Sequence, residues 1–144
     1  MYLKTVISYS GDNMTVFDIK KTMEILEHFY KLTKIKICVF DCNSVEIAYF
    51  PQKHTSFCEY VSSSPEGCKL CNSSVEKAFQ TCRSEKKRII YTCDMGFIEC
   101  VSPIIHNGVI IGYVMLGQTR DCKEPDTLLL KQISEKCGLN TNKL

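Results

Sequence analysis

Four cysteines are spaced so that their sulfur atoms could act together. Their pattern is C-x9-C-x2-C-x21-C, formed by Cys58, Cys68, Cys71 and Cys93. Thiolates at such spacings can bind zinc or hold an iron–sulfur cluster. Zinc ribbons repeat the two-residue gap of the middle pair, which this chain does not. Inert buried thiols and a thiol redox switch therefore stay open beside a metal or cluster site.

The rest of the sequence offers little for catalysis. It contains no phosphate-binding glycine loop, no H-E-x-x-H motif and no paired-carboxylate signature. A cysteine nucleophile would need a base, and we interpret the histidines His28, His54 and His106 as surface residues on a helix, in a loop and at a hairpin tip. We therefore do not expect an enzyme.

Composition narrows the class of protein further. The 144 residues predict one domain spanning 1–144, and the net charge of +2 gives no footprint for nucleic acid. No apolar run is long enough for a signal peptide or a membrane span. The ten cysteines are therefore expected to be reduced thiols of a cytoplasmic protein.

Two amphipathic helices are predicted in the first half of the chain. Thr15 and Asp18 resemble a capping box before an apolar stripe that could pack on the domain's own sheet or on a second copy. Ser64 and Pro65 predict the start of a helix that ends near Cys82. Cys68 and Cys71 would lie in the first turns of this helix, where the helix dipole favours the thiolate.

The remaining segments predict strands and a final helix. A turn over 41–44 joins strands at 35–40 and 45–50, a further strand spans 89–93, and Asn107-Gly108 joins strands at 97–105 and 109–116. Pro103 suggests a local edge or bulge, and glycines at 112 and 117 mark places where other atoms approach the backbone. The order predicts an α+β fold with about five antiparallel strands and helices on one side, ending in a helix from Glu124.

An ordered set of short motifs runs through the chain: Phe57-Cys58, Cys68, Tyr91 to Glu99, Pro103-Ile104, Asn107-Gly108, Ile111-Gly112 and Gly117-Gln118. This set resembles the PocR sensory domain family over Met14 to Asp121, with 122–144 forming the C-terminal helix. Asp94 departs from the family's usual histidine, Phe97 from its leucine, and Cys71 stands where a non-cysteine residue, commonly acidic, is usual.

The resemblance implies a PAS-like ligand-binding module at the N-terminus of a bacterial regulator, ahead of an AraC-type DNA-binding domain or a histidine kinase. Its implied ligands are small diols and related hydrocarbon derivatives. A bent sheet can enclose such a molecule with aromatic walls and a few polar groups. The candidate ligand-binding residues are Tyr60, Tyr91, Glu99, Tyr113 and Gln118. We expect a homodimer that signals without turnover, with the first helix as the transmitter.

Overall fold

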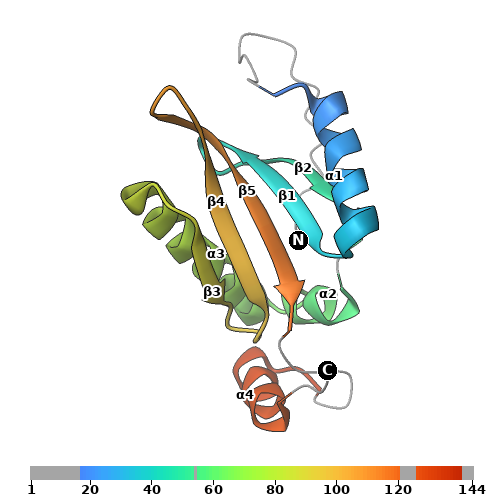
Figure 1. Cartoon of the computed structure of the whole chain (residues 1–144). Helices are drawn as coiled ribbons and strands as arrows, with labels where there is room; N and C mark the ends of the chain where they lie inside the picture. The colour runs from blue at the N-terminus through green and yellow to red at the C-terminus, as the bar shows by residue number, and fades with distance from the viewer. Residues whose placement is uncertain (1–16, 54, 121–125, 141–144) are drawn as a thin grey trace.

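A computed structural model describes residues 17–53, 55–120 and 126–140 of the chain, and Figure 1 shows the arrangement of its helices and strands. The elements along the chain are α1 (Ile19–Thr33), β1 (Lys36–Asp41), β2 (Glu46–Phe50), α2 (Ser56–Ser62), α3 (Pro65–Glu85), β3 (Ile89–Thr92), β4 (Ile98–His106), β5 (Val109–Thr119) and α4 (Thr127–Cys137).

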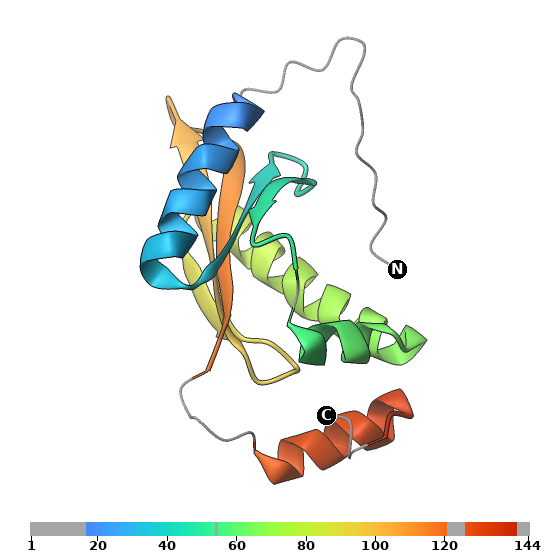
Figure 2. The same cartoon turned by 90° about the vertical axis from the view of Figure 1, so that its right-hand side faces the viewer.

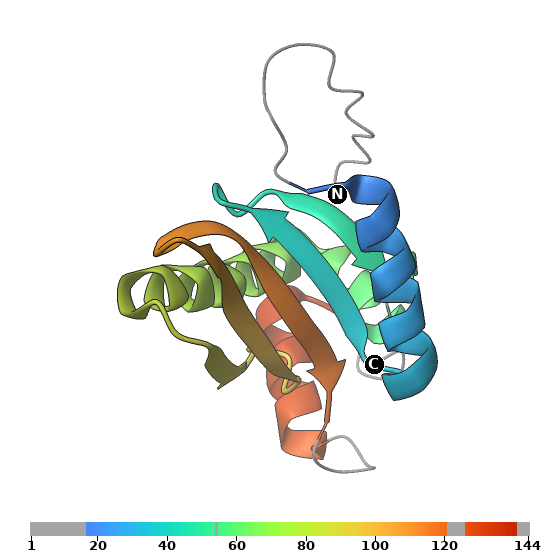
Figure 3. The same ribbon diagram turned by 45° about the horizontal axis from the view of Figure 1, so that its top comes forward.

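The strands form one sheet in the order β2-β1-β5-β4-β3, and every neighbouring pair is antiparallel. This confirms the predicted α+β fold with a five-stranded, PAS-like antiparallel sheet. The long β4–β5 hairpin stands at the middle of the sheet beside β1, as Figure 3 shows. At its tip Asn107 and Gly108 have φ angles of 48° and 78°, the positive values that the predicted turn requires.

The prediction that the helices lie on one side of the sheet is wrong. Leu26 of α1 packs on one face against Ile37 and Val39, whereas Phe79 of α3 packs on the other face against Phe40. Figure 2 shows α1 and α3 on opposite sides of the strands. Successive residues of a strand point to opposite faces, so the four consecutive buried residues of β1, Ile37 to Phe40, require a cover on both.

The helix ends follow local capping. Asp18 caps α1 by accepting a hydrogen bond from the Lys21 amide at 3.1 Å, so it is the cap itself and not the partner of Thr15, which lies outside the described residues. Ser64 caps α3 by accepting from the Gly67 amide, as predicted, and the helix runs to Glu85 rather than Cys82. The segment that carries Cys58 is a short helix, α2, which the sequence pattern did not indicate.

A separate apolar cluster joins α4 to the rest of the domain. Ile133 and Cys137 of α4 pack with Val61 of α2, and with Met95 and Phe97 at the β3–β4 turn. The final helix is capped by Asp126, and the predicted start at Glu124 lies outside the described residues. Within the described residues, no helix is long and apolar enough to cross a membrane.

Candidate functional site

A row of residues crosses four strands on the face of the sheet that α3 covers. Lys36 of β1 pairs with Gly117 of β5, and Tyr91 of β3 pairs with Glu99 of β4. Between Ile98 and Cys100 of β4 the register with β5 shifts, so the single residue Glu99 faces both Gly117 and Gln118. Such bulges re-aim side chains, often beside functional sites. We call Lys36, Gly117, Glu99 and Tyr91 the polar row.

The side chain of Glu99 occupies the space above Gly117. A Cβ atom at position 117 would lie 2.9 Å from Glu99 Cγ and 3.2 Å from Glu99 Oε1. The hydroxyl of Tyr91 donates a hydrogen bond to Glu99 Oε2 at 2.5 Å. Burial raises the pKa of Glu99 above its usual value of 4.5, against the opposing effects of the Tyr91 hydrogen bond and the Lys36 charge. The row therefore holds a partly buried carboxyl group that accepts a hydrogen bond from Tyr91 and is acted on by the charge of Lys36.

An open pocket of about 440 Å³ begins at the Lys36 end of the polar row. It lies between the end of α1, the β2–α2 connection and the end of β5. Lys36 and Gly117 belong both to the polar row and to the pocket lining, together with Gln118. Pockets of roughly 300–1,000 Å³ bind small molecules in other proteins. The pocket is therefore the place where a small molecule could reach the end of the row.

The predicted ligand-binding residues divide between this site and other places. Tyr91 and Glu99 are bonded to each other in the row, and Gln118 lines the pocket with a φ of 62°. Tyr113 is only 1% exposed, packs edge-on against Phe79 and accepts a hydrogen bond from Arg83 Nε at 3.0 Å. The structure thus brings together three of the five predicted residues and places Tyr113 in the apolar core.

Tyr60 lies in α2, outside the polar row. Its hydroxyl accepts a hydrogen bond from the backbone amide of Asn140 at 3.1 Å. That bond links α2 to the segment after α4. Tyr60 therefore acts as a connector between elements in the described structure.

The four cysteines of the predicted cluster are neighbours around Cys71. Cys58, Cys93 and Cys68 each act electrostatically on the Cys71 thiol. Cys58, Cys71 and Cys93 pack in the apolar cluster that joins α2, α3 and α4. The Glu99 charge also raises the pKa values of the Cys58 and Cys93 thiols, which shows that these thiols lie near the polar row.

The prediction that the start of α3 favours a thiolate is wrong for Cys71. Burial and, to a smaller extent, the neighbouring thiols raise the pKa of this thiol to about 11, against the opposing effect of a hydrogen bond with Ser62. Burial also raises the pKa values of Cys58 and Cys93. Across the described residues, no group of three or more His, Cys, Asp and Glu side chains is arranged to hold a metal ion.

Arg120 connects the end of β5 to the thiol-containing cluster. Its guanidinium lies over the rings of Phe57 and Phe97, with centroid distances of 5.2 and 4.4 Å. Phe57 precedes Cys58 in α2, and Phe97 precedes β4. Because Arg120 follows the bulge closely in the chain, it couples the position of β5 to both rings.

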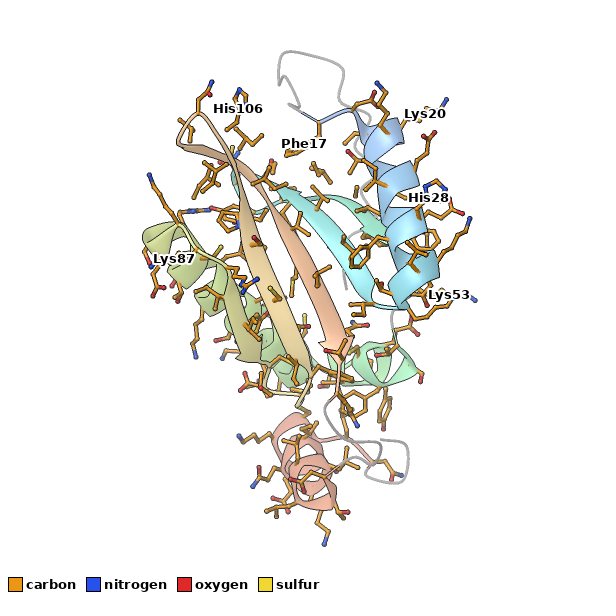
Figure 4. The ribbon with its side chains drawn as sticks, in the orientation of Figure 1. Phe17, Lys20, His28, Lys53, Lys87 and His106 are labelled. Carbon is orange, nitrogen blue, oxygen red and sulfur yellow. The ribbon has the colours of Figure 1, made fainter. Side chains whose placement is uncertain are left out.

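Two of the three histidines lie away from the row. His28 is on the outer side of α1 and His106 is at the tip of the β4–β5 hairpin, and both are exposed, as Figure 4 shows. This confirms their interpretation as surface residues. His54 lies outside the described residues.

Comparison with known proteins identifies the family of the chain. A family model described as the sensory domain found in PocR matches residues 15–144. The chain belongs to this family. No curated protein matches it. Among solved structures, the GAF domain/HD domain protein from Geobacter sulfurreducens is similar, with 14% sequence identity, a TM-score of 0.49, and coverage of 89% of this chain and 90% of that chain.

Asp94, which stands where the sequence resemblance implies a histidine, is bonded to α3 in this PocR domain. Ser74 of α3 donates a hydrogen bond to Asp94 Oδ2 at 2.7 Å, and its Oγ accepts from the Asp94 amide at 3.2 Å. The reciprocal pair fastens the β3–β4 turn to α3. Asp94 therefore holds in place the turn that follows Cys93.

Sequence reasoning found the close approach at Gly117 but missed Lys36 as a member of the site of this PocR domain. The glycine signalled that another group comes near the backbone at position 117, and the structure shows that this group is Glu99. Lys36 gave no comparable signal, because only the β1–β5 register shows that it stands opposite Gly117.

Proposed function

We propose that this PocR domain senses a small hydroxylated molecule, diol-like in character, that binds over the polar row without chemical turnover. The domain would serve as the cytoplasmic input module of a bacterial regulator. A sensory role is the established property of the family. The observation that carries the proposal is that Lys36 and Gly117 are shared by the row and the pocket, so that a molecule in the pocket would contact the two residues next to Glu99.

The chemistry of the row suits a hydroxyl group. A hydroxyl both donates and accepts hydrogen bonds. Glu99 supplies acceptor oxygens, and Lys36 supplies a donor that also acts on the Glu99 charge. A diol could use both groups at once, which would fix its orientation in the pocket.

The test is a titration of propane-1,2-diol by calorimetry and by the shift of the thermal midpoint. We expect the wild type to bind and Glu99→Gln to bind at least about tenfold more weakly. The reason is that the two acceptor oxygens of the carboxylate are replaced by one acceptor oxygen and one donor amide group. Tyr60→Phe is the matched control, since it removes a hydroxyl that bonds Asn140 outside the row. Equal affinity of wild type and Glu99→Gln contradicts the proposal.

A second candidate is a metal, iron–sulfur or thiol redox sensor. It is favoured by the gathering of Cys58, Cys68 and Cys93 around Cys71. Zinc or a cluster would require these thiols to lose protons and turn toward one another. Metal analysis and the visible spectrum of anaerobically purified protein test it, with Cys71→Ser as the variant and Cys82→Ser, in the other core, as the control. Absence of stoichiometric metal together with unchanged thiol counts under mild oxidation excludes this candidate.

We further propose that the domain is a homodimer in which α1 transmits the signal. Its inner residues, Met23, Leu26 and Phe29, pack on the sheet of the same chain. Its outer side carries Ile25 and Leu32, which are 65% and 87% exposed. Those outer residues are the part of the helix that a second copy could cover.

A further inference from the structure

The pocket at the end of the polar row is lined by cations. Lys34, Lys36 and Lys53 all contribute to it, from the residue after α1, from β1 and from the β2–α2 connection. Among the described lining residues none carries a carboxylate. The lining thus concentrates positive charge in a chain whose net charge is only +2.

The three lysines are not equivalent. The positive charge of Lys36 acts on the Glu99 carboxyl, so Lys36 is partly neutralised within the row and attracts an anion in the pocket less strongly. Lys34 is exposed and its Nζ lies 5.8 Å from the centre of the Tyr30 ring, which also lines the pocket. Lys53 is exposed in the β2–α2 connection, and Figure 4 shows it beside the end of α1 that Lys34 follows. Two exposed cations therefore lie near the end of α1, while Lys36 belongs to the row.

Two kinds of polarity follow one another from the row to the pocket. Next to the lining residues Lys36 and Gly117 lies the Glu99 carboxyl, which is not itself part of the lining, accepts hydrogen bonds and disfavours a second negative charge nearby. The lining itself offers the ammonium groups of Lys34 and Lys53. A ligand that satisfies both carries a hydroxyl at one end and an anionic oxygen group at the other.

We propose that the ligand of this pocket is a small hydroxylated anion, a hydroxycarboxylate or a polyol phosphate, whose anionic group is bound by Lys34 and Lys53. This inference rests on the proposed function and narrows its ligand class. A volume of about 440 Å³ accommodates a molecule of this size. Because the lysines are exposed to solvent, the attraction is moderate and sensitive to salt.

The experiment compares two pairs of molecules with the full chain at low ionic strength. Lactate is compared with propane-1,2-diol, and glycerol 3-phosphate with glycerol, so that each anion has a neutral partner of similar skeleton. We expect at least one anion to bind about tenfold more tightly than its partner, a gap that closes at about 0.5 M salt. The pair that shows the gap identifies the source of the negative charge as carboxylate or phosphate.

The variant is the double substitution Lys34→Gln with Lys53→Gln. It should abolish the gap between anion and neutral partner, with a loss of about two- to fivefold for each lysine. Lys87→Gln paired with Lys20→Gln is the control, because it removes the same charge at exposed positions that Figure 4 shows away from the pocket opening.

Three outcomes overturn the inference. If the neutral partners bind as tightly as the anions, the anionic ligand class is wrong and the proposed function stands. If the anions bind more tightly but the double variant keeps the gap, the anion site lies elsewhere and the inference fails alone. If none of the four molecules binds, the inference and the proposed function both fail.

Discussion

Glu99 extends its carboxyl group over the Cα atom of Gly117 on the neighbouring strand, where a Cβ atom would come within 2.9 Å of Glu99 Cγ. The two residues lie at the bulge between β4 and β5. The Glu99 side chain thus occupies the space that a side chain at position 117 would need. This relationship gives the polar row its shape and makes it open to direct test.

Gly117→Ala should displace the Glu99 side chain and destabilise the domain by about 1–3 kcal/mol, the usual range for overpacking. Chemical denaturation measures the change. In the double variant with Glu99→Ala the clash is removed, so the cost of Gly117→Ala should shrink to near zero. A cost that is the same with and without Glu99 contradicts the relationship.

Tyr91→Phe should raise the pKa of Glu99 further, because the Tyr91 hydrogen bond opposes the effect of burial. The titration of the Glu99 carboxyl carbon by nuclear magnetic resonance measures it. Tyr60→Phe should leave the titration unchanged, since its hydroxyl bonds Asn140. A pKa that falls or stays constant in Tyr91→Phe shows that the bond at 2.5 Å does not act on the carboxylate.

The raised pKa of Glu99 makes stability depend on pH. The folded state retains the Glu99 proton at pH values where the unfolded chain has lost it, so this contribution is fully present below about pH 4.5 and is lost as pH rises through the folded pKa. Within that window the free energy of unfolding should fall by up to about 1.4 kcal/mol per pH unit.

Glu99→Gln isolates this effect from other groups, since burial also raises the pKa of Glu46. Unfolding curves of wild type and variant across pH 4 to 8 (roughly the range in which such groups titrate) should diverge in slope above the usual carboxyl pKa. Parallel curves mean that Glu99 titrates normally in the folded domain.

Cys71 should react slowly with iodoacetamide. With a pKa of about 11, only about one thiol in a thousand is ionised at pH 8. Cys42 is exposed and provides an internal reference in the same chain. Mass spectrometry after timed labelling distinguishes the two, and equal rates would show that Cys71 is activated, in favour of the redox candidate.

Gln118→Gly should stabilise the domain by about 0.5–1 kcal/mol, because the φ of 62° at this position strains an L-residue and not glycine. Ligand affinity should fall at the same time, since the side chain lines the pocket. Thermal unfolding and calorimetry measure the two effects. A destabilised variant would mean that the side chain holds the bulge together.

The two sides of α1 should respond differently to a charge. Leu26→Glu should unfold the domain, because Leu26 is 2% exposed and packs on the sheet. Ile25→Glu should leave it folded, because Ile25 is 65% exposed, and should make a dimer monomeric if α1 forms the interface. Light scattering at matched concentration decides, and an unchanged dimer moves the interface away from this side of α1.

Local chemistry made most of the fold predictable. Asn107-Gly108 specifies its turn, and Ser64-Pro65 specifies the start of α3, because each acts within a few residues. The apolar stripe of α1 identified a helix, but the face of the sheet that it covers depends on how β1 crosses the domain. The face that a helix covers is set by the tertiary arrangement and not by the local sequence, so the prediction that the helices cover one face was wrong.

The site was predictable only in part for the same reason. Tyr91 and Glu99 are eight residues apart and pair across a simple hairpin, so their partnership follows from local strands. Lys36 is distant in the sequence and joins them only through the β1–β5 register. Tyr113 carries the same kind of side chain as Tyr91, but the core takes it because it lies beneath α3 beside Phe79.

Because both faces of the sheet are covered, successive residues of β1 contact the polar row on one face and α1 on the other. Lys36 stands in the polar row, and the next residue, Ile37, packs beneath Leu26 of α1 on the other face. One peptide unit of β1 thus joins a residue of the pocket lining to a residue that packs under the helix that we propose as the transmitter. Tyr30 of α1 also lines the pocket, so we expect a bound ligand to act on this helix both directly and through β1.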